Sequence, residues 1–171
     1  MLIFGRKSQY ESIICENYKQ IYRLLVYLAN DSSIAEDLTQ ETFLRAWASL
    51  KDFKEKSSVS TWLNRIAYNA FIDSIRKQKK FENASPGPGD SNSQVIPSPL
   101  QTLLGNETSK SLYAAINKLG QEEKYMIVLH YIQGFSFSEM SGILVEPVGT
   151  VKWRTNQALQ KIRGHLGNGE L

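Results

Sequence analysis

Hydrophobic positions recur at helical spacing in three successive segments of the first eighty residues. From residue 8 to residue 30, apolar side chains return every three or four positions, which predicts one amphipathic helix. A second helix is expected to begin with Ser32 or Ser33 as its cap, and a third covers about 60–80. The apolar side of the second helix would carry Ile34, Leu38, Phe43, Leu44 and Trp47, and that of the third Trp62, Leu63, Ile66, Ala70 and Ile75.

The same period returns in the last third of the chain. The segments 103–119 and 121–132 are expected to be helices, and Gly134 offers the left-handed stop that most residues resist. A short helix then reaches Leu144, and Pro147 stands where a last helix opens. Its inward positions are predicted to be Val151, Ala158, Leu159 and Ile162. No segment alternates as a strand would, so the pattern predicts an all-α protein.

A break in composition separates the two helical blocks. The stretch 81–99 reads FENASPGPGDSNSQVIPSP and holds four of the five prolines of the chain. A structureless loop of this length is uncommon inside one compact domain, whereas it is ordinary between domains. We therefore expect two small helical domains, 1–80 and 103–171, joined by a flexible linker over 81–102.

Charge and cysteine content exclude several classes of protein. The 20 Lys and Arg against 17 Asp and Glu give a net charge of +3, which is too small to indicate a polyanionic partner by itself. The single cysteine, Cys15, cannot form an internal disulfide, and no Cys/His cluster has metal-site spacing. Because neither a signal-peptide core nor a long apolar run is evident, we expect a cytoplasmic protein without a bound metal.

The last two helices have the order of a helix-turn-helix motif. A short helix and a turn of about three residues precede the run EPVGTVKWRTNQALQK at 146–161, which is basic and free of acids after Glu146. In such a motif the second helix enters the DNA major groove and its first turns reach the base edges. A basic amphipathic helix that stood alone would more often be a solvated surface, and that alternative remains open at this point.

Three stretches together carry a family resemblance. They are DLTQETFLRAW at 37–47, STWLNRIAYNAFIDSIRK at 60–77 and GFSFSEMSGILVEPVGTVKWRTNQALQKIR at 134–163. In order and spacing they closely resemble successive segments of the extracytoplasmic-function sigma factors. The resemblance implies a dissociable, non-catalytic subunit of bacterial RNA polymerase that carries the core enzyme to a subset of promoters, with a stress or envelope regulon as the expected set.

The resemblance also implies partners and domain roles. The first domain would bind the clamp helices of the beta-prime subunit and open the minus-10 element, and the second would read the minus-35 element near the beta flap. Core RNA polymerase, double- and single-stranded promoter DNA and an anti-sigma factor are the expected partners. No cofactor and no small-molecule substrate are expected.

Residues that match the family segments are the candidates for each surface. Core polymerase would be bound by Asp37, Gln40, Glu41, Leu44 and Arg45. The minus-10 element would be contacted by Lys54, Lys56, Ser60, Trp62, Arg65, Asn69, Arg76 and Lys77. The minus-35 element would be contacted by Val148, Gly149, Thr150, Lys152, Trp153, Arg154, Asn156, Gln157 and Lys161.

The chemistry of these residues supports the assignment but leaves alternatives. Seven basic residues face only two acids between residues 54 and 80, an excess that suits phosphates, and the aromatic residues among them can stack on unpaired bases. Asp37 could instead only satisfy the dipole of its helix, and Trp62 fits core packing as well as base contact.

Three residues of the motif depart from the family pattern. Ser141 stands where the family commonly has alanine, and Val145 where it has glycine, although valine is disfavoured at a positive φ. Trp153 stands where the family usually has a small residue.

The runner-up function is a stand-alone helix-turn-helix regulator, but the sequence of the N-terminal half shows no pattern for a receiver or a ligand pocket. Neither His130 nor His165 lies in a catalytic motif.

Overall fold

The computed structural model describes residues 2–53, 57–84 and 107–167, with the backbone alone at 2–9, 82–84 and 107–108. Every regular element in these ranges is helical, as the hydrophobic pattern predicts. Within the same ranges, no helix has the length and apolar character needed to cross a membrane. The chain divides into two compact units, Met1–Ile96 and Pro97–Leu171, which are treated separately below.

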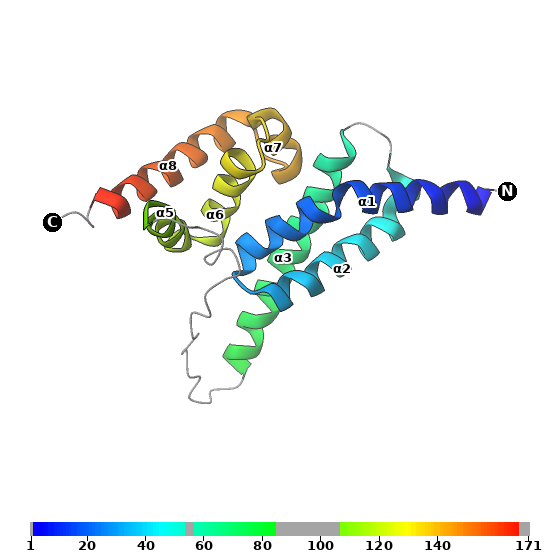
Figure 1. Cartoon of the computed structure of the whole chain (residues 1–171), viewed down its shortest axis with the longest axis horizontal. Helices are drawn as coiled ribbons and strands as arrows, with labels where there is room; N and C mark the ends of the chain where they lie inside the picture. The colour runs from blue at the N-terminus through cyan, green and yellow to red at the C-terminus, as the bar shows by residue number, and fades with distance from the viewer. Residues whose placement is uncertain (1, 54–56, 85–106, 168–171) are drawn as a thin grey trace. The chain divides into compact units, whose positions relative to one another are not determined.

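Up to residue 84, the described part of the N-terminal unit is a bundle of three helices, α1 (Leu2–Ala29), α2 (Ser32–Ser49) and α3 (Val59–Ala84). Each helix packs against the other two, and Figure 1 shows them side by side. The interior is formed by Ile13, Ile21, Leu24, Leu25, Val26 and Leu28 of α1, Ala35, Leu38, Phe43 and Ala46 of α2, and Leu63, Ala67, Ala70 and Phe71 of α3. Burial of these apolar side chains is the main force that holds the bundle together.

The junction of α1 and α2 differs in detail from the expected one. Asn30 ends α1 in the left-handed region with φ 58°, which asparagine tolerates better than most residues. Asp31, rather than Ser32 or Ser33, caps α2, because its carboxylate accepts the backbone N–H of Ile34 at 2.9 Å. The serines lie inside the first turn of the helix.

The apolar side of α2 is narrower than its sequence suggests. Leu38 and Phe43 are buried, whereas Ile34, Leu44 and Trp47 are exposed. The prediction that all five share the buried side is therefore wrong. Two flanking helices cover only one side of α2, and the threonines Thr39 and Thr42 take buried positions there.

Helix α3 is longer than predicted. It begins at Val59 and continues through Ala84, four residues past the expected end at Lys80. Nothing in Phe81 to Ala84 opposes a helix, whereas the proline at position 86 disfavours helical backbone in the residue before it. The remainder of the predicted linker lies outside the described residues.

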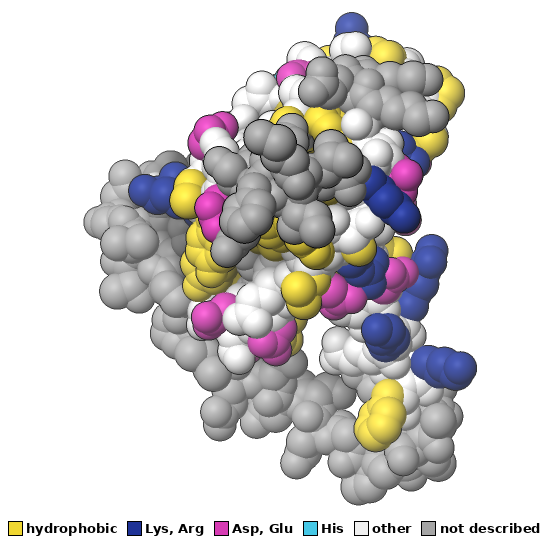
Figure 2. Space-filling view, turned by 90° about the vertical axis from the view of Figure 1, so that its right-hand side faces the viewer, with side chains coloured by type: hydrophobic (Ala, Val, Ile, Leu, Met, Phe, Trp, Pro, Cys, Tyr) yellow, Lys and Arg dark blue, Asp and Glu magenta, His cyan; other side chains and the backbone are white. Residues whose placement is uncertain are grey.

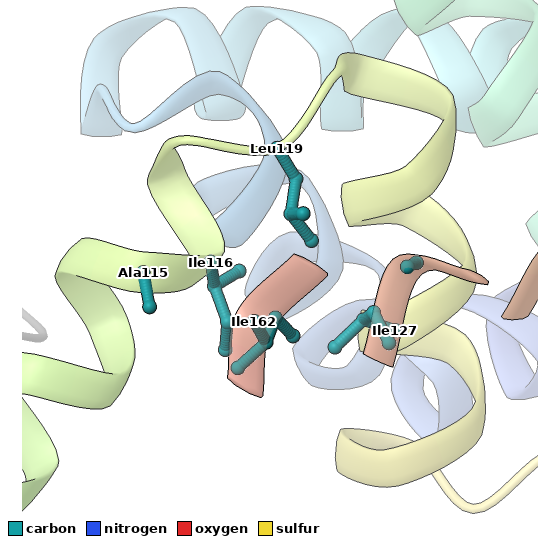
Figure 3. Close-up of a cluster of buried hydrophobic side chains, with 6 residues drawn as sticks. Ala115, Ile116, Leu119, Ile127 and Ile162 are labelled. Carbon is teal, nitrogen blue, oxygen red and sulfur yellow. The ribbon is translucent and has the colours of Figure 1, made fainter. Parts of the chain in front are cut away.

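In its described residues, 107–167, the C-terminal unit has four helices and a π-helical segment. These are α5 (Glu107–Asn117), α6 (Gln121–Ile127), the π-helical segment Val128–Ile132, α7 (Phe137–Leu144) and α8 (Val148–Gly167). Figure 3 shows one part of its core, in which α5, the turn before α6, α6 and α8 contribute Ala115, Ile116, Leu119, Ile127, Ala158 and Ile162. Leu159 packs against this cluster, so all four inward positions predicted for α8 are buried or partly buried.

The turns that aim α7 and α8 use distinct backbone conformations. Gly134 has φ 77°, as predicted for a glycine stop. Ser136 and Glu139 then form a reciprocal cap of α7, and the hydrogen bonds from Ser136 lower the pKa of the Glu139 carboxyl. At the other end of α7, Val145 occupies the left-handed region with φ 58° and ψ 40°. That conformation costs a non-glycine residue about 1–2 kcal/mol.

Candidate functional site

The exposed side of α2 brings together four of the five candidates for polymerase binding. Asp37, Gln40, Glu41 and Leu44 follow one another at steps of three, one and three residues, so they share one face of the helix. Asp37, Gln40 and Leu44 are exposed, and Leu44 is 69% accessible although it is apolar. We call these four residues the docking stripe. Ile34 and Trp47 are also exposed on α2, so Leu44 is not the only apolar side chain that this helix offers to a partner.

The fifth candidate, Arg45, lies at the edge of the docking stripe and is bound within the unit. Its guanidinium donates to Glu41 Oε1 at 2.6 Å and to Asp73 Oδ2 of α3 at 2.9 Å. The hydrogen bond to Asp73 is the main cause that raises the pKa of Arg45. Arg45 therefore connects α2 to α3 and neutralises an acid that lies on α3.

One side of α3 presents four of the described minus-10 candidates. Trp62, Arg65, Asn69 and Arg76 follow one another at steps of three, four and seven residues and so face the same way. Arg65, Asn69 and Arg76 are exposed. Trp62 is half-buried, with its ring centroid 4.8 Å from that of Phe53, so it packs against the unit and still keeps an accessible edge.

The remaining minus-10 candidates differ in what the structure says of them. Lys54 and Lys56 lie outside the described residues. Ser60 is partly buried, and its hydroxyl donates to Gln20 Oε1 of α1 at 3.4 Å. Lys77 is exposed near the end of α3.

Basic side chains continue along the C-terminal half of α3. The five residues 76–80 are all exposed, and four of them are Arg or Lys. Figure 2 shows dark-blue side chains gathered in the lower part of the view, the end of the molecule at which Figure 1 places the C-terminal half of α3. A helix face of this charge attracts phosphate groups.

Helix α8 exposes most of the minus-35 candidates along one face. Gly149, Lys152, Trp153 and Asn156 are exposed and spaced three, one and three residues apart, and Trp153 is 62% accessible. Val148, Thr150 and Gln157 are exposed on the flanks of that face. The opposite side is buried, and it includes Thr155, which sequence reasoning did not identify as an interior residue.

Two basic candidates on α8 form ion pairs with acidic residues of the C-terminal unit. Arg154 donates through Nη1 to Glu146 Oε1 at 2.6 Å and through Nη2 to Glu122 Oε2 of α6. Lys161, two turns further along α8, donates to Glu123 Oε1 at 2.5 Å. Burial acts to lower the pKa of Arg154, but its bonds to Glu146 and Glu122 outweigh this and raise it overall.

These ion pairs line a shallow groove of about 590 Å³ between the start of α6 and α8. Its walls are formed by Gly120, Gln121, Glu122, Glu123, Trp153, Arg154, Gln157 and Lys161. The three acids of these ion pairs, Glu122, Glu123 and Glu146, are contacts that sequence reasoning missed. Glu122 and Arg154 are 32 residues apart, so no helical spacing could have indicated the pair.

Comparisons with known proteins agree with the two units. The family "Sigma-70 region 2" matches residues 13–81, and "Sigma-70, region 4" matches residues 109–162. The docking stripe and the described α3 candidates up to Lys77 lie in the first match, and all the α8 candidates lie in the second.

Relatives and a solved structure agree with the family matches. The chain is 35% identical to the ECF RNA polymerase sigma factor SigW of Bacillus subtilis over 95% of this chain and 91% of the relative. It is 30% identical to ECF RNA polymerase sigma factor SigE of Mycolicibacterium smegmatis over 92% of this chain and 61% of that longer protein. The structure of Bartonella quintana sigma factor RpoE matches with a TM-score of 0.77 and 24% identity, covering 93% and 97% of the two chains.

Proposed function

Since the chain belongs to the extracytoplasmic-function RNA polymerase sigma factors, we propose that it works through three surfaces: the docking stripe for core polymerase, α3 for the minus-10 element and α8 for the minus-35 element. The observation that carries the proposal is that most of the described candidates for each step are exposed on one helix, α2, α3 or α8 respectively. Like its family, the chain acts as an initiation factor in which we assign no catalytic step. We place its action in the cytoplasm, with the polymerase.

The docking stripe suits a partner helix of mixed polarity. Leu44 supplies an apolar anchor, and Asp37 and Gln40 surround it with groups that accept and donate hydrogen bonds. We propose that these residues dock on the clamp helices of the beta-prime subunit. Arg45 would act behind them, because it holds Glu41 in place and joins α2 to the DNA-facing helix.

The surface of α3 suits the junction of double- and single-stranded DNA. Arg65, Arg76 and Lys77 would bind phosphates, and Asn69 can pair with a base edge. The accessible edge of Trp62 would support a base that has left the stack, while its contact with Phe53 fixes the ring. A preformed surface of this kind captures an open base without ATP, since flipping costs only about a few kcal/mol.

The exposed face of α8 would read the minus-35 element in the major groove. Lys152 and Asn156 carry hydrogen-bonding groups to base edges, and Trp153 and Val148 offer apolar contact to thymine methyl groups. Because Arg154 and Lys161 are held by carboxylates, we assign the direct contacts to the other candidates.

Removal of the docking stripe tests the function directly. We expect Asp37→Ala, Gln40→Ala and Leu44→Ala together to weaken binding to core RNA polymerase by at least about tenfold, since buried anchors dominate interface energy. Fluorescence titration of labelled chain with core enzyme measures the affinity. Glu36→Ala is the matched control, because it removes a carboxylate from the same helix about 100° away from Asp37.

Transcription from a selected promoter separates the proposal from its alternative. Wild-type chain with core enzyme should yield specific transcripts from a promoter fragment that this holoenzyme selects out of a genomic library. A stand-alone helix-turn-helix regulator would bind operator DNA without core enzyme and give no transcript with it. That result, or core affinity unaffected by the triple change, would contradict the proposal.

We propose that an anti-sigma factor is a further partner. The Bartonella quintana sigma factor RpoE was solved in complex with the anti-sigma factor NepR, and CnrH, which has a TM-score of 0.67 with this chain, in complex with the cytosolic domain of CnrY. Co-purification with the tagged chain from its native cell tests this, and recovery of polymerase without any such protein would oppose it.

A further inference from the structure

The turn between α7 and α8 holds a backbone conformation that its own side chain opposes. Val145 lies in the left-handed region, and its side chain is 66% exposed, so little packing compensates for the strain. Glycine adopts this conformation at no steric cost, whereas a β-branched residue rarely does. Other residues therefore have to hold the turn, and the structure shows which ones do.

Ser141 closes the turn from the side of α7. Its hydroxyl donates to the backbone carbonyl of Glu146 at 2.5 Å. Its own carbonyl oxygen accepts the N–H of Val145 and, at 3.3 Å, the N–H of Glu146. These hydrogen bonds span the strained residue and fix the direction in which the chain leaves it. The first of them requires a side-chain hydroxyl at this position.

Arg154 closes the turn from the side of α8. Its guanidinium bridges Glu146, in the turn, and Glu122, on α6, with one nitrogen to each carboxylate. A planar guanidinium suits this two-sided contact, which the single charged nitrogen of a lysine cannot reproduce. The second carboxylate oxygen of Glu146 is buried and accepts no hydrogen bond among the described residues. Glu146 therefore depends on Arg154 to compensate its charge.

We infer that Ser141, Glu146, Arg154 and Glu122 form a turn clamp that sets the angle of α8, and that Val145 makes this clamp necessary. The inference rests on the proposed function, because it concerns the positioning of the same DNA-reading helix. Arg154 is then a positioning residue and not a DNA contact. If the clamp loosens, a smaller fraction of chains presents α8 correctly, and the apparent affinity for the minus-35 element falls in proportion.

A double-mutant cycle between Ser141 and Val145 tests the clamp in the complete holoenzyme. The measured quantity is discrimination, the ratio of affinities for a promoter fragment selected by the wild-type holoenzyme and for the same fragment with its minus-35 element scrambled. Ser141→Ala should lower discrimination by up to about fivefold, the limit set by the loss of one hydrogen bond. In the Val145→Gly background the same change should cost less than about twofold, because glycine holds the turn unaided.

The control variant is judged by the same discrimination ratio. Ser138→Ala makes the same chemical change at an exposed position of α7 and should leave discrimination unchanged. An equal loss in the valine and glycine backgrounds would overturn the inference, and so would no loss in either. If wild-type holoenzyme shows no discrimination at all while it transcribes from the promoter, the minus-35 role fails instead, which is a separate result.

A conservative change at Arg154 distinguishes positioning from DNA contact. Arg154→Lys keeps the charge but breaks the bridge between the two carboxylates, so discrimination should fall by about fivefold while the dependence of affinity on salt is unchanged. A phosphate contact predicts the reverse: the lysine variant keeps discrimination, and Arg154→Gln reduces the salt slope by about one. The reverse pattern would overturn the assignment of Arg154.

Discussion

Both units carry basic residues on a candidate DNA-binding helix, but the two helices differ in whether those residues form ion pairs. On α3, Arg65, Arg76 and Lys77 are exposed, and none of them forms an ion pair among the described residues. On α8, Arg154 and Lys161 are each paired with a carboxylate of the same unit. The basic residues of α3 are therefore free to neutralise phosphates, whereas part of the charge of α8 is used to build the unit itself.

The interiors of the two units also differ in the charge of their buried polar groups. Among the described residues, the buried polar groups of the N-terminal unit are neutral: Thr39, Thr42, Thr61 and Asn64. Thr39 and Thr42 satisfy their hydroxyls on carbonyl oxygens of their own helix, at 2.6 and 2.7 Å. The C-terminal unit instead buries Lys124, which is only 4% exposed. The C-terminal unit thus bears an electrostatic cost that the other avoids.

The largest expected effect follows from that buried lysine. Burial lowers the pKa of Lys124 from 10.5 to about 8. A shift of about 2.5 units corresponds to roughly 3 kcal/mol. Because the unfolded chain binds the proton more tightly, the cost is complete below about pH 8 and disappears as the pH rises toward 10.5. Lys124→Met should therefore raise the free energy of unfolding at pH 7 by up to about 3 kcal/mol.

Urea unfolding monitored at several pH values measures this effect. The free energy of unfolding of the wild-type C-terminal unit should rise between pH 8 and 10. In the methionine variant this rise should be absent. Lys118→Met is the matched control, because Lys118 is exposed on the neighbouring segment and should change neither quantity. A methionine variant that is less stable than wild type at pH 7 would show that the ammonium contributes net favourable contacts.

The second prediction compares unpaired and paired basic residues directly. Arg76→Gln with Lys77→Gln should make the slope of log affinity against log salt for holoenzyme on promoter DNA less negative by about two, because two phosphate contacts are lost. Between 50 and 200 mM salt, that difference is worth about tenfold in affinity. Filter binding at four salt concentrations gives the slope.

Lys161→Gln supplies the paired counterpart. Since Glu123 already holds its ammonium at 2.5 Å, its loss should leave the salt slope within about half a unit of wild type. A change of the salt slope by about one unit, as expected for each basic residue removed from α3, would mean that DNA displaces Glu123 from Lys161. The contrast between the unpaired basic residues of α3 and the paired ones of α8 would then be wrong.

The sequence predicts the helices and part of the faces that they expose, but it does not predict the ion pairs between helices. Local information suffices for the approximate helix positions and the Gly134 stop, because each depends mainly on residues within a few turns. The docking stripe also follows from spacing along a single helix. The partners of Arg154 do not, since Glu122 reaches it only when α6 packs on α8. The exposure of Leu44 and Trp47 likewise depends on which side of α2 its neighbours cover.

The smallest expected effect concerns Arg45, the ion-pair bridge between α2 and α3. Arg45→Gln should lower the free energy of unfolding of the N-terminal unit by no more than about 1 kcal/mol, because all three partners are partly exposed and such pairs are weak. Urea titration gives the shift, and adding Asp73→Asn should recover part of it by removing the unpaired carboxylate. The same double variant should bind promoter DNA no worse than the single one, since α3 then carries less negative charge. A loss beyond about 2 kcal/mol would contradict this prediction, because it exceeds what a partly exposed ion pair contributes.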